Sequence, residues 1–162
     1  MALTAHCADL PPRAEPHQRN EVGLGAERPS VRKQAPDGPA SWSASELALF
    51  TGEGSLTLHA GDDPPGHGES VELGMVVAGK RLFVRAYRGP GSRWYQAALA
   101  ARHGWIRARG DAWQVTLSPA DDQPHGDIDI AYQAKYGHLG AAATALVLSP
   151  GAHTATLRIS PR

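Results

Sequence analysis

The sequence predicts an α+β fold in which short helices flank a mostly antiparallel sheet or small barrel. Two pairs of short alternating segments are each joined by a glycine-containing turn, as in β-hairpins. Another alternating segment precedes the first pair, and one more lies near the C-terminus. The segments between them space their apolar residues as helices do and are bounded by serine, aspartate or glycine.

The first half of the domain is predicted to hold a helix, a strand and a hairpin. Serine caps helices well, alternation of apolar and polar residues is typical of strands, and glycine permits a tight hairpin turn. These rules place a helix that Ser43 or Ser45 caps and Gly52 ends, a strand at 55–60, a loop at 61–68, and a hairpin of 71–78 with 81–87 around Gly79-Lys80.

The second half is predicted to repeat this alternation of helices and strands. Glycine often ends a helix because it tolerates a left-handed backbone. The predicted elements are a helix that Ser92 caps and Gly104 ends, a hairpin of 105–109 with 112–117 around Gly110-Asp111, a helix from Gly126 or Asp127 to Gly137, a helical or irregular segment at 141–148, and a final strand at 153–159.

The folded domain is predicted to span residues 42–162, since all ten aromatic residues lie from Trp42 onward. Residues 1–41 hold six of the 13 prolines and only isolated large apolar side chains. Such a segment buries too little apolar surface to offset the entropy lost on ordering, so a disordered proline-rich tail is predicted. A start of translation downstream of Met1 is the alternative.

Charge is segregated along the chain, although 16 basic residues balance 16 acidic ones. Residues 42–72 carry six acids and residues 111–134 carry five, with no lysine or arginine in either segment. Between them, residues 73–110 carry eight basic residues and no acid. Acidic flanks and a pI of about 7.1 argue against a nucleic-acid partner. The basic block instead marks a place for a small phosphorylated or anionic ligand.

One stretch of this block combines the features of an anion site. A strand runs through a glycine loop into a helix start, where free backbone N–H groups and the helix dipole favour an anion. Arginine forks suit phosphate, and aromatic rings offer stacking surfaces. The candidate binding residues are Arg85, Tyr87, Arg88, Gly89, Gly91, Ser92, Arg93 and Trp94. The alternative is an ordinary strand–helix connection whose aromatics pack into the core.

Other patterns are weaker. The residues His59, Asp62, Asp63 and His67 lie close together in sequence, but an exposed Pro-Pro-Gly turn is favoured over a metal site. The single cysteine, Cys7, cannot form an internal disulfide. The sequence has no run of 18 apolar residues and no secretory signal pattern, so we expect no membrane span and a cytoplasmic location.

Three motifs resemble one family of small bacterial proteins, the domain-of-unknown-function family 2255. They are LFVRAYRGPGSRWYQAALA, AYQAKYG at 131–137 and SPGAHTATLRISPR at 149–162. More distantly, the chain is similar to split β-barrel proteins that bind flavin or deazaflavin coenzymes. This resemblance implies a small split β-barrel with short flanking helices, a coenzyme phosphate near Arg85–Trp94, and a homodimer.

Two hypotheses about function stay open. In the first, the protein binds FMN or a deazaflavin coenzyme and acts in hydride-transfer redox chemistry, which the coenzyme performs, so no catalytic acid or base is assigned. In the second, a non-catalytic split barrel has no coenzyme, or binds another small anionic metabolite. Function does not follow from fold alone, so the residues of the site must decide.

Overall fold

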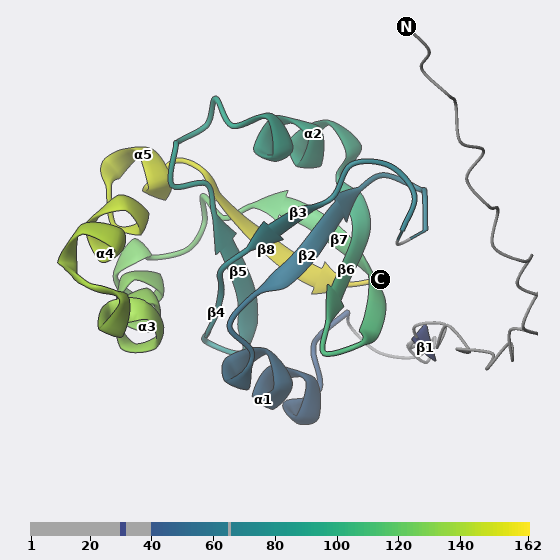
Figure 1. The fold of residues 1–162 in the computed structure, drawn as a ribbon, viewed down its shortest axis with the longest axis horizontal. Coiled ribbons are helices and arrows are strands. Elements are labelled where there is room, and N and C mark those ends of the chain that lie inside the picture. The colour runs from purple at the N-terminus through teal and green to yellow at the C-terminus, as the bar shows by residue number, and fades with distance from the viewer. Residues whose placement is uncertain (1–29, 32–39, 65) are drawn as a thin grey trace, which may run out of the picture.

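The computed structural model describes residues 30–31, 40–64 and 66–162, which form a small barrel with flanking helices (Figure 1). The strands are β1 (Ser30–Val31), β2 (Leu56–Ala60), β3 (Val71–Leu73), β4 (Met75–Ala78), β5 (Arg81–Arg85), β6 (His103–Ala108), β7 (Asp111–Pro119) and β8 (Thr156–Pro161). The helices are α1 (Ala44–Gly52), α2 (Arg93–Ala101), α3 (His125–Tyr136), the short turn η1 (Gly137–Leu139), α4 (Ala141–Val147) and α5 (Pro150–His153). The predicted α+β class is confirmed.

Seven antiparallel strands form a nearly closed barrel whose two edges are joined by one residue. Their order is β3-β2-β6-β7-β8-β5-β4, and each neighbouring pair is antiparallel. β3 therefore lies at one edge and β4 at the other, yet only Gly74 separates them in sequence. The chain passes directly from one edge of the sheet to the other and closes the barrel at this seam.

Helix α3 holds the seam through polar groups. The Tyr136 hydroxyl accepts a hydrogen bond from the Met75 N–H at 2.8 Å, and Lys135 Nζ donates to the Phe50 and Met75 carbonyls, each at 2.8 Å. A Cβ at position 74 would lie 3.2 Å from the Tyr136 hydroxyl, so Gly74 lets the phenol approach. Burial lowers the pKa of Lys135 to about 8, partly offset by the charge of Glu53.

Apolar side chains fill the barrel and its two ends. Strand residues such as Leu58, Val84 and Ile106 form the main core, all at most 2% exposed. α1 and α2 lie at opposite ends of the barrel (Figure 1). At the α1 end, the rings of Trp42 and Phe50 meet edge to face with centroids 4.8 Å apart, a favourable geometry for aromatic pairs.

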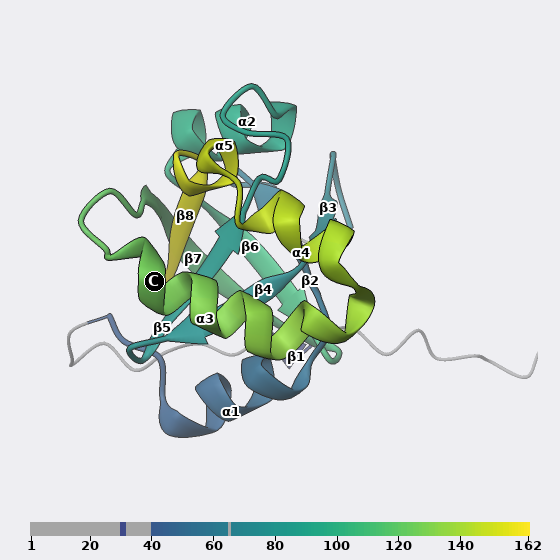
Figure 2. The same ribbon diagram turned by 90° about the vertical axis from the view of Figure 1, so that its left-hand side faces the viewer.

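The outer face of β4 and β5 is also buried, because α3, α4 and α5 cover this side of the barrel (Figure 2). Phe83 on β5 packs with Ile128 and Tyr132 of α3, and each side chain is 1% exposed. Alternation along the extended segment Arg81–Tyr87 places Phe83 and Arg85 on the same face as Tyr87, which is half exposed. Both Phe83 and Arg85 are instead covered by the C-terminal helices.

Most predicted elements are confirmed, and α1 begins with the predicted serine cap. Ser43 caps this helix in a reciprocal capping box with Glu46. The turn of the first hairpin is also as predicted, since Gly79 and Lys80 both have positive φ, as a type I′ turn requires. The predicted strand at 71–78 is divided at Gly74, so only its second half pairs with β5.

Several element ends were predicted wrongly. α2 ends at Ala101, and Arg102 with φ 62° follows it as the cap, so the helix does not extend to Gly104. Gly104 lies inside β6, where a Cβ would come within 2.1 Å of the His59 carbonyl oxygen, so close strand packing explains this glycine. The second hairpin turns at Arg109-Gly110, both with positive φ, and not at Gly110-Asp111, because Asp111 already pairs with Ala108. The predicted last strand at 153–159 is shifted, because His153 ends α5 and β8 begins at Thr156.

Little of the predicted tail is described. Cys7 and most of residues 1–41 lie outside the described residues. Within them, β1 pairs in parallel with β7, with Ser30 opposite Asp111. No helix in the part of the chain that the structure describes has the length and apolar character needed to cross a membrane.

Candidate functional site

A cavity of about 1000 Å³ lies between the glycine loop before α2 and the loop that joins β2 to β3. Its lining residues come from β2, the 61–70 loop, β3, the glycine loop and α2. They are Leu58, His59, Ala60, Asp63, Gly68, Glu69, Ser70, Val71, Glu72, Leu73, Tyr87, Arg88, Gly91, Ser92, Arg93, Trp94 and Ala97. The cavity is large enough for a coenzyme-sized ligand.

One wall of the cavity is basic. Arg88 and Arg93 are exposed and form no ion pair with any described residue. The Arg88 guanidinium lies 5.6 Å from the centre of the Tyr87 ring, which keeps it beside an aromatic surface. Two arginine forks without counter-ions on one wall suit a phosphate or a carboxylate.

The start of α2 adds backbone donors to this wall. Ser92 occupies the cap position, but its side chain does not cap the helix. Its hydroxyl donates to the Gly89 carbonyl at 2.9 Å instead, whereas Ser43 caps α1. The first N–H groups of α2 therefore have no side-chain acceptor, and the positive end of the helix dipole lies at the cavity. The start of α2 thus lies at the cavity, but the predicted side-chain cap by Ser92 is absent.

The opposite wall is acidic. Three acidic residues, Asp63, Glu69 and Glu72, line it. Glu72 accepts a hydrogen bond from the Ser55 hydroxyl, whereas Asp63 and Glu69 have no ion-pair partner among the described residues. No ion pair crosses the cavity in this part of the chain, so it presents opposite charges on facing walls.

The structure brings together six of the eight predicted binding residues. Tyr87, Arg88, Gly91, Ser92, Arg93 and Trp94 line the cavity. Gly89 does not line it, because a Cβ there would face the backbone of Gly151 at 3.7 Å. Arg85 does not line it either, since its side chain points toward α3–α5. Tyr87 is the exposed ring of the group, whereas Trp94 is half-buried against the core.

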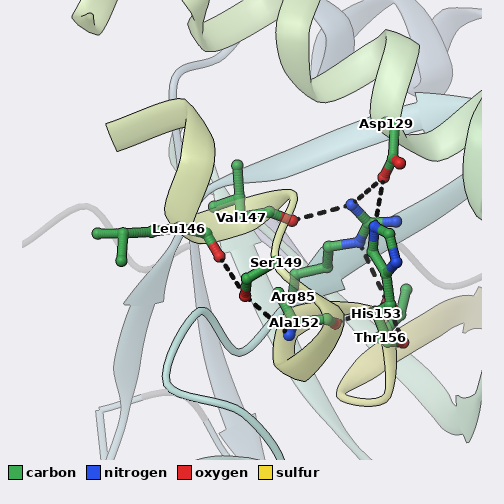
Figure 3. Close-up of polar contacts among 8 residues, drawn as sticks. All are labelled: Arg85, Asp129, Leu146, Val147, Ser149, Ala152, His153 and Thr156. Carbon is green, nitrogen blue, oxygen red and sulfur yellow. Dashed lines mark hydrogen bonds and ion pairs between the residues drawn. The ribbon is translucent and has the colours of Figure 1, made fainter. Parts of the chain in front are cut away.

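Arg85 belongs to a buried polar cluster at the junction of β5, α3 and α5 (Figure 3). Its side chain has no exposed surface and forms an ion pair with Asp129. Its other hydrogen bonds reach the Thr156 hydroxyl at 3.1 Å and the Val147 carbonyl at 2.9 Å. His153 contacts the same Asp129 oxygen at 3.0 Å. Arg85 therefore joins the helices to the barrel.

A second histidine completes this cluster. The rings of His125 and His153 stack with centroids 4.6 Å apart and an interplanar angle of 7°. The pKa of His125 is lowered, mainly because burial removes water from the ring, and further by the charges of His153 and Arg85. No group of three or more histidine, cysteine or acidic residues in the described ranges is arranged to hold a metal ion.

A model of one protein family matches most of the chain. The model of DUF2255, an uncharacterized protein conserved in bacteria, matches residues 46–159. The chain belongs to this family. The resemblance predicted from the three motifs is confirmed. The match runs from α1 into β8, and so includes both walls of the cavity and the Arg85 cluster.

Other comparisons give more distant likenesses. No curated protein matches the chain. Among solved structures, the chain is similar to a FAD-binding protein from Mesorhizobium loti, with 14% identity and a TM-score of 0.42 over 74% of this chain and 88% of that one. It is also similar to the FAD and heme binding protein from Mycobacterium smegmatis, with 16% identity and a TM-score of 0.39 over 73% of this chain and 65% of that one.

Sequence reasoning missed part of the cavity in this DUF2255 protein. It treated His59 and Asp63 as members of one exposed turn, but both line the cavity and His59 is only 8% exposed. The alternation of β2 places His59 on the opposite face from Leu56 and Leu58. It is buried there because the 61–70 loop returns over it. In the sequence, the sign of this close approach is the glycine at position 68. In the structure, Gly68 has a positive φ and leaves no room for a Cβ beside the His59 ring.

Proposed function

We propose that this protein binds a phosphorylated flavin-type coenzyme, FMN or a deazaflavin, in the cavity between the 61–70 loop and α2. The observation that carries the proposal is the basic wall, where one cavity is faced by two arginines without an ion-pair partner among the described residues and by a helix start without a side-chain cap. Arg88, Arg93 and the N–H groups of α2 would hold the phosphate. Tyr87 and Trp94 would contact the ring system.

The residues present fit such a group. The donors of the basic wall match the acceptor oxygens of a phosphate, and a cavity of about 1000 Å³ accommodates a tricyclic ring with its sugar chain. When bound, the coenzyme supplies hydride transfer, and the protein orients it and limits its contact with water. No described side chain is assigned as a catalytic acid or base.

Titration of the purified full-length protein with FMN and with riboflavin tests this proposal. The two ligands differ by one phosphate, so wild-type protein is expected to bind FMN at least about tenfold more tightly. The Arg88→Ala and Arg93→Ala variants should reduce this preference, and Arg81→Ala on β5 should not. Equal affinity for FMN and riboflavin would show that the basic wall does not bind the phosphate.

Absence of binding to FMN and to a deazaflavin coenzyme would overturn the proposal. The alternative would then be a non-catalytic protein that binds another small anion through the same wall. The homodimer expected from the split-barrel resemblance is tested on the same material by analytical ultracentrifugation. Fractionation of cells tests the cytoplasmic location.

A further inference from the structure

His59 lies at the part of the cavity formed by β2 and the 61–70 loop. Its side chain is among the few polar ones that the structure buries, with 8% of its surface exposed. The ring nitrogen Nδ1 lies 2.8 Å from the Glu69 carbonyl oxygen. Because a carbonyl only accepts hydrogen bonds, Nδ1 must carry a proton. In the neutral ring, Nε2 is then an acceptor with a free lone pair.

No described residue occupies that lone pair. The contact to Glu69 is the only hydrogen bond that the His59 side chain makes within the described part of the chain. His59 is one of the residues that line the cavity. Among the described side chains, only Arg85 Nη2 and His125 Nδ1 are fully buried without a partner, so His59 Nε2 is accessible to solvent and to a ligand. A ligand donor that replaces solvent here satisfies an acceptor that the fold leaves free. This acceptor therefore marks a ligand contact on the side remote from the basic wall.

The surrounding loop fixes the ring. A Cβ at position 68 would lie 2.8 Å from His59 Cε1, so the Gly68 backbone packs against the edge of the imidazole. Gly68 has φ +77°, which side chains rarely adopt. With Glu69 bonded to one nitrogen and Gly68 against the adjacent carbon, the ring has one orientation. A fixed acceptor costs little entropy on binding and so favours specificity.

The charges that line the cavity also favour a ligand orientation in which the uncharged end lies near His59. The negative charges of the lining residues Asp63, Glu69 and Glu72 disfavour a second anion at this end of the cavity. A ligand with one anionic end therefore places that end at Arg88 and Arg93. Its uncharged end, with N–H or O–H groups, faces the acidic wall and His59.

We propose that His59 is a specificity-determining residue of this cavity, which accepts a hydrogen bond through Nε2 from an N–H or O–H group on the uncharged end of the ligand. This inference rests on the proposed flavin site. The isoalloxazine imide N–H and the sugar-chain hydroxyls are donors of this kind. Ligands that lack such a donor, or that carry an anion at both ends, are disfavoured.

Two substitutions of His59 in the full-length protein separate ligand contact from loop anchoring. His59→Asn keeps an amide N–H near the Nδ1 position, and so retains the bond to Glu69, but has no atom at the Nε2 position. His59→Gln places an amide oxygen near the Nε2 position and gives up the bond to Glu69. The exposed loop histidine His67, which does not line the cavity, serves as the control in His67→Asn.

We expect FMN to bind the His59→Asn variant at least about tenfold more weakly than wild type. The His59→Gln variant should bind FMN more tightly than the Asn variant, although its urea midpoint is lower. A purely structural role predicts the reverse order, and that result would overturn the proposal. Nitrogen-15 spectra of the ligand-free protein give a second readout, because a proton on Nε2 of the neutral ring would overturn it as well.

These outcomes differ from failure of the proposed function. If wild-type protein does not bind FMN, the flavin proposal fails and the inference fails with it. If wild type binds FMN and His59→Asn binds equally well, only the role of His59 is wrong.

Discussion

Arg85 and Arg88 are three residues apart, yet they lie in opposite environments. The Arg85 side chain is fully buried, pairs with Asp129 and bonds to two further oxygens. Arg88 is exposed, lies beside the Tyr87 ring and has no ion-pair partner among the described residues. The first joins helices to the barrel, and the second is available to a ligand.

The basic residues of one sequence segment therefore do not all lie on the same surface of the protein. Arg85 is used within the fold because α3 and α5 cover the outer face of β5. Arg88 and Arg93 lie at the glycine loop and the start of α2, after the strand has ended, and both are exposed. Burial and counter-ions, and not residue type, distinguish a structural arginine from a candidate ligand-binding one.

Loss of the Asp129 carboxylate should give the largest effect. Asp129→Asn leaves the buried Arg85 guanidinium without a counter-ion, which costs about 3–5 kcal/mol of the free energy of unfolding. Urea unfolding measures this change. Asp127→Asn, at an exposed position of the same helix, is the control and should cost less than about 1 kcal/mol. Equal small effects of both substitutions would erase the contrast between the two arginines.

Substitution of the cavity arginines should weaken ligand binding and leave the free energy of unfolding almost unchanged. Arg88→Ala or Arg93→Ala removes a charge-assisted contact worth about 1.5–3 kcal/mol, and so weakens FMN binding by about tenfold to a hundredfold. The free energy of unfolding should change by no more than about 0.5 kcal/mol, because neither side chain has an ion-pair partner to lose. A marked loss of stability would show that Arg88 and Arg93 have a structural role, as Arg85 does.

Lys135 gives an intermediate case, since it is half-buried and bonded only to carbonyls. Its pKa of about 8 is below the value of 10.5 in an unfolded chain. Between these values the unfolded state binds more protons, so the contribution of Lys135 to stability rises with pH. Relative to Lys135→Met, wild type should gain about 1 kcal/mol from about pH 7 to pH 10, a value reduced by solvent screening.

Urea unfolding of both proteins at the two pH values measures this gain. Burial raises the pKa values of Tyr132 and Tyr136, which adds a pH dependence of stability near pH 10, but the difference between wild type and variant cancels this contribution to first order. A difference that does not change with pH would show that Lys135 keeps its ordinary titration despite its burial.

The smallest expected effect concerns His125. Because its folded pKa is lowered, the unfolded state binds more protons as the pH falls below about 6.5, and stability decreases from about pH 7 to pH 5. His125→Phe keeps a ring stacked on His153 without a charge, so its stability should fall by about 0.5 kcal/mol less over this range. Thermal melts compare it with His138→Phe, an exposed control. An unchanged pH dependence would remove His125 from the cluster's electrostatics.

The fold class could be predicted because it depends on local chemistry. Serine caps, glycine turns and alternation gave the order of helices and strands and the hairpin at Gly79-Lys80. The predictions that failed concern features that depend on contacts between residues distant in sequence. Gly74 divides a strand because Tyr136, 62 residues later, binds next to it. Gly104 resembled a helix end, but its role is to let β2 approach β6.

The candidate site was predictable in part for the same reason. The glycine loop and helix start are contiguous in sequence, so Arg88–Trp94 could be grouped as one wall. The facing wall comes from β2, β3 and their loop, and nothing local connects His59 or Glu69 with Arg93. Arg85 was grouped with the site because a period of two cannot show that helices cover the outer face of β5.

The seam at Gly74 has a consequence for the order of assembly. β3 and β4 are the edge strands of the sheet, and the Met75 N–H is held by a hydroxyl 61 residues further along the chain. During synthesis, both edges therefore emerge well before the helix that secures them. Nascent chains that end before Tyr136 expose unpaired strand edges, which are templates for pairing with other chains. Chaperone demand is expected to fall only once α3 has docked and β8, which emerges later still, has paired with β5 and β7.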